Sequence, residues 1–110
     1  MDWATDKVVN NEIAFRSANN GLRDKFVELG GHDLVPFLCE CGEFTCTTIV
    51  RVSLELYASI RDQPAWFLIS PGHKQLDSER VVEQGDGYEI IEETGAAGEL
   101  ARARWVAHQP

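Results

Sequence analysis

The chain has 110 residues, of which 44% are hydrophobic and 25% charged, a composition typical of one globular domain. Its formal net charge of -8 at pH 7 argues against nucleic-acid binding, which draws most of its affinity from neutralised phosphates, and against binding to anionic membranes. No apolar run approaches the roughly 20 residues of a membrane span, and the first residues lack the basic and apolar regions of a signal peptide. We therefore expect a cytoplasmic protein.

The N-terminal part, residues 5–29, has the apolar periodicity of an amphipathic helix. Thr5 is a candidate N-cap, and Gly30 is suited to end the helix. The sequence over residues 19–21, Asn-Asn-Gly, favours turns, so the segment is either one helix, with or without a bend, or two helices. The expected apolar stripe steps by three or four residues and consists of Phe15, Ala18, Leu22, Phe26 and Leu29, with Ile13 and Val9 on a neighbouring flank.

The middle of the chain alternates short strands with one short helix. Residues 34–39 and 47–52 are rich in apolar and β-branched side chains and predict two strands. Ser53 is expected to cap a helix over residues 54–61. The continuous apolar run over residues 66–69 predicts a further strand, with Trp66 in the core.

The clearest pattern is a β-hairpin formed by residues 79–84 and 88–93. Gly85 and Gly87 lie in the connection and can adopt the positive φ of a tight loop. Because the two strands are rich in glutamate, their edges are protected against aggregation.

After the hairpin, residues 95–98 contain two glycines and predict a flexible hinge. Residues 99–107 predict a C-terminal helix in which Trp105 anchors the helix onto the domain or onto a partner. The sequence thus predicts one α+β domain over residues 1–110, with an N-terminal helix, antiparallel strands and a core over residues 34–93.

Acidic residues are concentrated near the C-terminus. Between Asp77 and Glu99 there are eight acidic side chains and one basic side chain, Arg80. The interpretation we favour is that these acids form solvated strand faces that keep the protein soluble. The alternative is an acidic surface that docks a basic protein partner.

Three cysteines, Cys39, Cys41 and Cys46, form a C-x-C-x4-C pattern. Residues two apart on a strand share a face, so Cys39 and Cys41 can aim at one point, and Gly42 permits a bend that returns Cys46 to them. His73 follows Ser-Pro-Gly in a turn and can supply a fourth ligand. Three thiolates and one imidazole form a standard closed zinc site without a position for water, which is structural rather than catalytic.

Other interpretations of this pattern stay open. The fourth ligand could instead be His32, His108, Glu40 or Glu43, or the cysteines could be three small buried hydrophobic residues. The same ligands could hold a [2Fe-2S] cluster, since the set resembles the three cysteines and one histidine of the CDGSH iron–sulfur proteins. The chain lacks the Cys-Asp-Gly-Ser sequence of that family.

Three segments carry a broader resemblance. FLCECGEFTC, SLELYASIRDQPAWFLISPGH and SERVVEQGDGYEIIEE resemble small uncharacterised bacterial proteins, mostly actinobacterial. In those proteins a C-E-C, a following Cys, an "EYE..R" helix, a "PGH" turn and a "VV…GY.VV" hairpin recur in this order. The resemblance covers roughly residues 11–93 and implies that Cys39, Cys41, Cys46 and His73 belong together. It implies no activity, and the helix departs from the pattern because it reads LELYA over residues 54–58.

No nucleophile elbow, P-loop, dinucleotide-binding or zinc-protease motif is present. A catalytic pair of Cys46 and His73 would leave Cys39 and Cys41 unexplained, whereas metal ligation explains all four. We therefore expect no enzyme but a zinc-binding protein that acts as a regulatory or scaffolding protein-binding module. The alternative is a thiol-based redox sensor, because zinc-bound thiolates can be oxidised.

Overall fold

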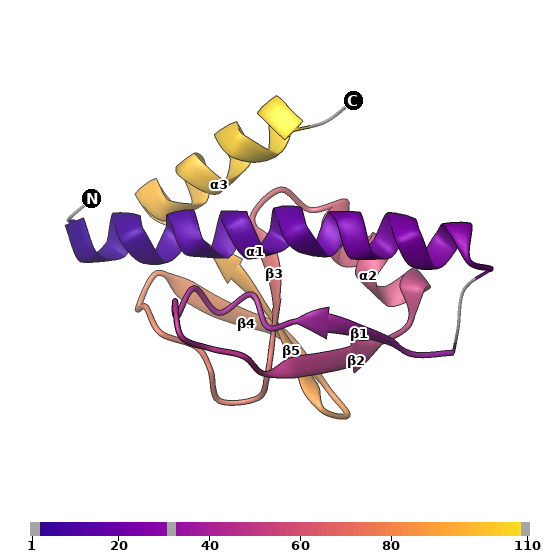
Figure 1. Cartoon of the computed structure of the whole chain (residues 1–110). Coiled ribbons are helices and arrows are strands. Elements are labelled where there is room, and N and C mark those ends of the chain that lie inside the picture. Colours follow the sequence, from indigo (N-terminus) through magenta and orange to yellow (C-terminus); the bar gives the residue numbers. More distant parts are fainter. Residues whose placement is uncertain (1–2, 31–32, 109–110) are drawn as a thin grey trace.

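A long N-terminal helix crosses the molecule, with the strands on one side of it and the C-terminal helix on the other (Figure 1). The structure is a computed structural model that describes residues 3–30 and 33–108, with the side chains described up to residue 105. In chain order the elements are α1 (Trp3–Glu28), β1 (Val35–Leu38), β2 (Ile49–Val52), α2 (Leu54–Arg61), β3 (Trp66–Ile69), β4 (Glu79–Gly85), β5 (Tyr88–Glu93) and α3 (Gly95–His108). This is the α+β architecture that the sequence predicts.

The strands form two antiparallel sheets. β1 pairs with β2, and β5 lies between β3 and β4 in the second sheet. The predicted hairpin is β4 and β5, with a register shift between Val81 and Glu83. Of its two connecting glycines, Gly87 has a positive φ of 79°, and Gly85 does not. The sheets meet where the backbone N–H of Glu40 donates to the carbonyl of Leu68, 2.7 Å away.

The core lies between the sheets, α1 and α2. Tyr57 of α2 stacks on Phe37 of β1, with ring centroids 4.2 Å apart, and Phe67 of β3 is fully buried. Ser53 caps α2 as predicted, because its side chain accepts a hydrogen bond from the N–H of Leu56. The core therefore fixes both chain segments that flank the cysteines.

The prediction of which face of α1 is buried is wrong. Ala18 and Leu29 are exposed, Phe15 is half-buried, and Leu22 and Phe26 pack only partly against the core. The face that is buried consists of Val9, Glu12, Ile13, Arg16 and Asn19. Three of these five residues are polar, and the hydrogen-bond partners of Arg16 and Asn19 come from distant segments, which a periodicity of apolar residues cannot reveal.

One uninterrupted helix spans residues 3–28, so the Asn-Asn-Gly sequence does not break α1, and Thr5 lies within the helix. Asn19 is the reason that this sequence is tolerated. Its side-chain amide donates to the carbonyl of Leu38 and accepts from the N–H of the same residue, both at 2.9 Å. The residue thus acts as a clamp between α1 and β1.

The C-terminal helix begins at Gly95, so the hinge predicted over residues 95–98 is part of α3. Gly98 packs against the end of β5, where a Cβ atom would lie 2.5 Å from the carbonyl oxygen of Glu93. Trp105 anchors α3 as predicted, because its indole N–H donates to the carbonyl of Arg61 at 2.8 Å. Trp66, expected in the core, is half-buried, and its indole N–H points to Glu92 at 3.3 Å.

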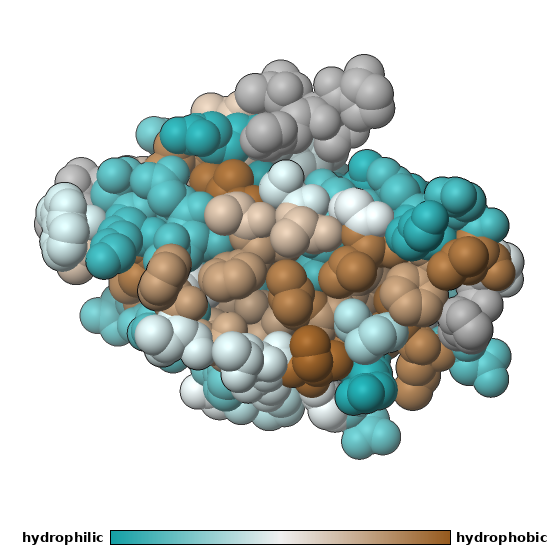
Figure 2. Space-filling view, viewed as in Figure 1, coloured by the Kyte–Doolittle hydropathy of each residue, from teal (hydrophilic) through white to brown (hydrophobic). Residues whose placement is uncertain are grey.

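The surface on the strand side of α1 is strongly hydrophobic. Figure 2 shows a band of hydrophobic side chains below α1, over β1 and β2. Exposed large residues near these elements include Val27 of α1, Leu34 before β1 and Ile49 of β2.

Candidate metal centre

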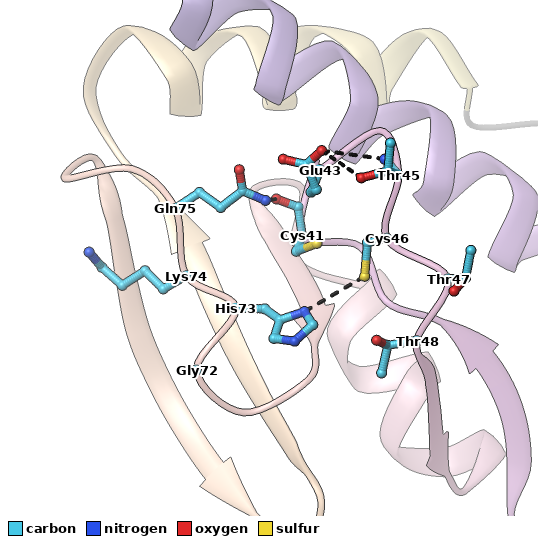
Figure 3. A pocket seen from close by; sticks show the side chains of 10 residues that line it. All are labelled: Cys41, Glu43, Thr45, Cys46, Thr47, Thr48, Gly72, His73, Lys74 and Gln75. Atoms are coloured by element: carbon cyan, nitrogen blue, oxygen red, sulfur yellow. Dashed lines mark hydrogen bonds between the residues drawn. The ribbon is translucent and has the colours of Figure 1, made fainter.

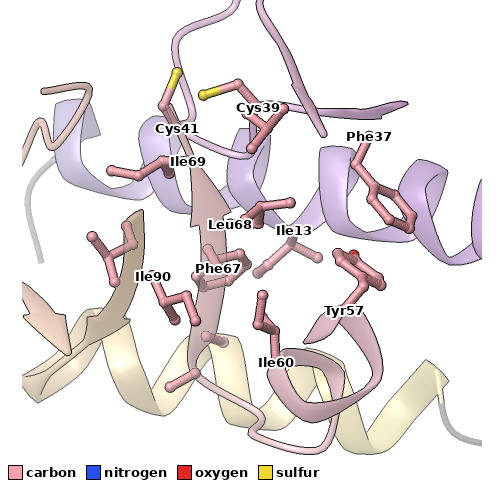
Figure 4. Close-up of a cluster of buried hydrophobic side chains, with 14 of the residues drawn as sticks. Ile13, Phe37, Cys39, Cys41, Tyr57, Ile60, Phe67, Leu68, Ile69 and Ile90 are labelled. Carbon is pink, nitrogen blue, oxygen red and sulfur yellow. The ribbon is translucent and has the colours of Figure 1, made fainter. Parts of the chain in front are cut away.

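The cysteine loop, residues 39–48, connects β1 to β2 and lies beside the turn that carries His73 (Figure 3). Beyond β1 the backbone stays extended, since the N–H of Cys39 donates to the carbonyl of Thr48 at 3.0 Å. Cys39 and Cys41 therefore project to the same side, with their sulfur atoms at the edge of the core (Figure 4). Both side chains are buried, as the period of a strand predicts.

Glu40 points into the opposite side of this segment and is fully buried. One carboxylate oxygen accepts from the hydroxyl of Tyr57 at 2.6 Å and from the amide of Asn19 at 2.7 Å. The other accepts from the N–H of Leu68 at 2.9 Å. Burial raises the pKa of Glu40, although these hydrogen bonds oppose the shift. Glu40 is thus no metal ligand in this arrangement, but it ties the cysteine loop to α1, α2 and β3.

Gly42 makes the bend that follows Cys41. Its φ is +84°, and a Cβ atom there would lie 2.7 Å from both the side chain and the carbonyl oxygen of Val8. Asn11 donates to the Gly42 carbonyl at 3.0 Å. The loop then turns back through the hydrogen bond from the N–H of Cys46 to the carbonyl of Glu43. The Glu43 side chain is exposed and accepts from Thr45, so it does not face the cysteines.

His73 enters from the turn after β3. Its N–H donates to the carbonyl of Ser70 at 3.1 Å, and Gly72 adopts a φ of +82°. The N–H of Gly72 also donates to the buried carboxylate of Glu89 in β5 at 3.0 Å. The turn is therefore held by the neighbouring strand, and the imidazole points toward Cys46 (Figure 3).

The four side chains that the spacing predicts come together in one cluster. Their ligand atoms all lie within 4.8 Å of one another. The Nδ1 atom of His73 is 3.5 Å from the sulfur of Cys39 and 3.7 Å from that of Cys46. Tetrahedral zinc, with bonds of about 2.3 Å to sulfur and about 2.0 Å to nitrogen, sets a sulfur–nitrogen separation of about 3.6 Å. The cluster could therefore hold one metal ion.

Two of the alternative ligands lie outside this description. His32 is not among the described residues, and the side chain of His108 is likewise outside them.

The electrostatics differ between the three thiols. Burial raises the pKa of Cys39, against a hydrogen bond from the N–H of Ser70 at 3.2 Å, and burial also raises the pKa of Cys41. For Cys46 burial acts in the same direction, but hydrogen bonds from Thr48, Cys41 and His73 outweigh it and lower the pKa to about 7. Because metal ligation requires thiolates, a bound cation would compensate the cost of ionising the two buried thiols.

The cluster is enclosed on one side and open on the other. Cys46 and His73 are half-exposed and line a surface pocket of about 470 Å³ together with Thr45, Thr48 and Gln75. Cys41 also lines this pocket, although its side chain is buried. Solvent therefore reaches the cluster from the side of Cys46, whereas Cys39 is covered by the core.

The acidic C-terminal segment differs from the expectation of solvated strand faces. Glu83 and Asp86 are exposed, but Glu79, Glu89 and Glu93 are buried. The hairpin therefore presents fewer charges to solvent than its sequence indicates. The charge pattern does not reveal this burial, because it depends on segments distant in the chain, such as the Gly72 turn beside Glu89 and the Ser78 segment beside Glu93.

Comparisons of the chain with protein-family models, with curated proteins and with solved structures found no match in any of the three. The resemblance to actinobacterial proteins stays a prediction. Within the described ranges, no helix is long and apolar enough to cross a membrane.

Proposed function

We propose that the protein binds one zinc ion through Cys39, Cys41, Cys46 and His73, and that the ion is structural. The observation that carries this proposal is the convergence of four ligand atoms from two separate segments to within 4.8 Å of one another. With three sulfurs and one nitrogen the coordination is complete, so no open position is left for a reacting water.

The ligand spacing also favours zinc over a [2Fe-2S] cluster. Such a cluster divides its four protein ligands between two irons, so ligands on different irons must lie farther apart than ligands on one ion. Here no pair of ligand atoms is more than 4.8 Å apart.

The proposed zinc ion adds to the hydrogen bonds that already join two parts of the chain. The cysteine loop belongs to the first sheet and His73 to the turn that leaves the second, and Gln75 adds a hydrogen bond from its side-chain amide to the carbonyl of Cys41 at 2.8 Å. Zinc binding in zinc-finger peptides contributes about 10–16 kcal/mol at neutral pH, which is comparable with the whole stability of a small domain, about 5–15 kcal/mol.

As a working role, the domain is a regulatory or scaffolding module that binds another protein. Phe44 supports this role because it lies in the metal-held loop between Cys41 and Cys46 and is 74% exposed. A hydrophobic band also lies over β1 and β2, the two strands that this loop connects (Figure 2). Large aromatic side chains are enriched in the centres of protein interfaces, so the zinc ion would fix the position of a contact residue.

Replacing Cys41 by Ser tests the structural role of the ion. We expect loss of stoichiometric zinc and a large fall in the melting temperature, because the variant removes one of two buried ligands. The matched control is Thr47→Ser in the same loop, which should keep both. A Cys41→Ser protein that melts like the wild type would contradict a structural ion.

A redox-sensing role is the second candidate, and the accessibility of Cys46 favours it. This thiol is half-exposed and lines the surface pocket, and solvent access promotes oxidation of a thiolate. If the protein is a sensor, mild peroxide releases zinc and lowers the melting temperature. Zinc that stays bound at peroxide levels that oxidise free thiols would exclude this role.

A further inference from the structure

Three buried carboxylates from distant parts of the chain meet beneath α1. Glu12 comes from α1, Glu79 begins β4 and Glu93 ends β5. Glu12 and Glu93 are 0% exposed and Glu79 is 3% exposed. One carboxylate oxygen from each lies within 4.8 Å of the other two. None of these residues belongs to the zinc site.

In Glu79 and Glu93 one carboxylate oxygen accepts a hydrogen bond and the other accepts none. The Oε1 atom of Glu79 accepts from the N–H of Gln75 at 2.8 Å, and the Oε1 atom of Glu93 accepts from the hydroxyl of Ser78 at 2.9 Å. The Oε2 atoms of both residues are buried and have no hydrogen-bond partner among the described residues. The supporting bonds thus orient these carboxylates rather than saturate them.

Glu12 has no such support. Both of its carboxylate oxygens are buried and accept from no N–H or O–H donor in the described part of the chain, and the side chains that interact with them are the carboxyl groups of Glu93 and Glu79. Buried polar groups are nearly always satisfied, and an uncompensated buried carboxylate is among the most costly groups that a protein interior can contain. Burial and then the neighbouring Glu93 raise the pKa of Glu12 well above its usual value.

Arg16 does not satisfy this cluster. It lies one turn beyond Glu12 on α1, but its guanidinium donates to the carbonyls of Pro64 at 2.6 Å and of Ala101 at 3.3 Å. Either bound protons or a bound cation must therefore neutralise the three carboxylates.

We propose that Glu12, Glu79 and Glu93 form a second metal site, which takes a hard divalent cation of the Ca²⁺ or Mn²⁺ class. The donor set consists of carboxylate oxygens alone, which suits these cations and not a soft ion. Calcium binds oxygen at 2.3–2.6 Å, so two oxygens on one ion can be up to about 5 Å apart. The observed span of 4.8 Å falls within this limit.

Two sets of contacts link this site to the proposed zinc site. Gln75, whose N–H holds Glu79, donates its side-chain amide to the carbonyl of Cys41. Gly42 packs closely against α1, where a Cβ atom would lie 2.9 Å from the Cγ atom of Glu12. Occupation of the carboxylate site would therefore steady the backbone on which two zinc ligands are carried.

Electron paramagnetic resonance with Mn²⁺ tests this proposal. The full chain is first loaded with one equivalent of Zn²⁺ in metal-free buffer and then titrated with Mn²⁺, whose free-ion signal falls on binding. We expect one Mn²⁺ site, competed by Ca²⁺, and at least tenfold weaker binding in Glu12→Gln. The matched control is Glu55→Gln, which removes an exposed carboxylate of α2 and should leave the affinity unchanged.

The melting temperature supplies an independent measurement on the same proteins. Mn²⁺ should raise it for the wild type and for Glu55→Gln, but not for Glu12→Gln. If Glu12→Gln does not fold, Ser78→Ala serves in its place, since it keeps all three carboxylates but releases Glu93 and should weaken Mn²⁺ binding.

Two results would overturn the proposal. One is a wild-type protein that binds no Mn²⁺ and no Ca²⁺, which would mean that protons alone neutralise the cluster. The other is binding that Glu12→Gln, or Ser78→Ala in its place, leaves unchanged. Because zinc content is measured in every sample, failure of this site is distinguishable from failure of the zinc site.

Discussion

Replacing Glu40 by Gln tests how the cysteine loop is positioned. The carboxylate accepts from three donors, the Tyr57 hydroxyl and the N–H groups of Asn19 and Leu68. Glutamine has one oxygen and one NH2 group, so it cannot accept from both sides. Asn19 cannot turn its amide to compensate, because it is bound at both ends to Leu38.

The size of the destabilisation expected for Glu40→Gln follows from these contacts. If the glutamine oxygen faces Asn19 and Tyr57, its NH2 group opposes the N–H of Leu68, and in the other orientation it opposes the amide of Asn19. Either way one buried N–H loses its acceptor, which costs about 1–3 kcal/mol. Removing a buried charge offsets part of this loss, since burial raises the pKa of Glu40. We therefore expect a net destabilisation of about 1–2 kcal/mol, equivalent to roughly 4–8 °C in melting temperature per kcal/mol.

Thermal unfolding followed by circular dichroism, at one equivalent of zinc, measures this effect. Glu43→Gln is the matched control, because Glu43 lies in the same loop and is exposed, and it should stay within about 0.5 kcal/mol of the wild type. The Glu40→Gln protein should still bind one zinc ion. A melting temperature equal to that of the wild type would refute the anchoring role, and a folded variant without zinc would refute the conclusion that Glu40 is no ligand.

Three further predictions concern the bend, the carboxylate cluster and α3. Gly42→Ala should destabilise the protein by about 2–4 kcal/mol, because its Cβ atom would meet Val8 at a positive φ. Gly21→Ala on the open face of α1 should instead stabilise it by up to about 1 kcal/mol, and chemical denaturation compares the two. Burial raises the pKa of Glu79 from 4.5 to about 7. A carboxyl group whose pKa is higher in the folded than in the unfolded protein contributes to stability at low pH. This contribution is lost as the pH rises through the folded-state pKa. The zinc-loaded protein without other divalent cations should therefore melt lower at pH 8 than at pH 6, and Glu79→Gln should reduce the difference; an equal difference in the variant would contradict the assignment. Trp105→Phe should cost about 1 kcal/mol by removing the bond to Arg61, and hydrogen exchange in α3 should rise.

The elements whose signals are local could be predicted from the sequence. Ser53 marks the start of α2 because a cap needs only the next turn of the helix. Cys39 and Cys41 share a face because the period of a strand is two. That Cys46 and His73 lie beside these two cysteines could also be predicted, since a glycine bend and a Pro-Gly turn each reverse the chain within a few residues.

Features that depend on distant partners could not be predicted. Glu40 was a candidate metal ligand because it lies between two cysteines. The donors that hydrogen-bond to its carboxylate lie 17 to 28 residues away in the sequence. In the sequence Glu12 is a polar residue that interrupts an apolar pattern on α1. It belongs to a cluster only because β4 and β5 bring Glu79 and Glu93 close to it. Gly95 and Gly98 favoured a hinge, whereas the missing side chain of Gly98 allows α3 to pack on the end of β5.

Elemental analysis combined with an absorption spectrum, on protein purified without a histidine tag, tests the central claim most directly. The account predicts one zinc per chain and no visible absorption band, with the zinc lost in a His73→Ala variant. Folded wild-type protein that contains no metal, or that contains iron and absorbs visible light, would contradict it.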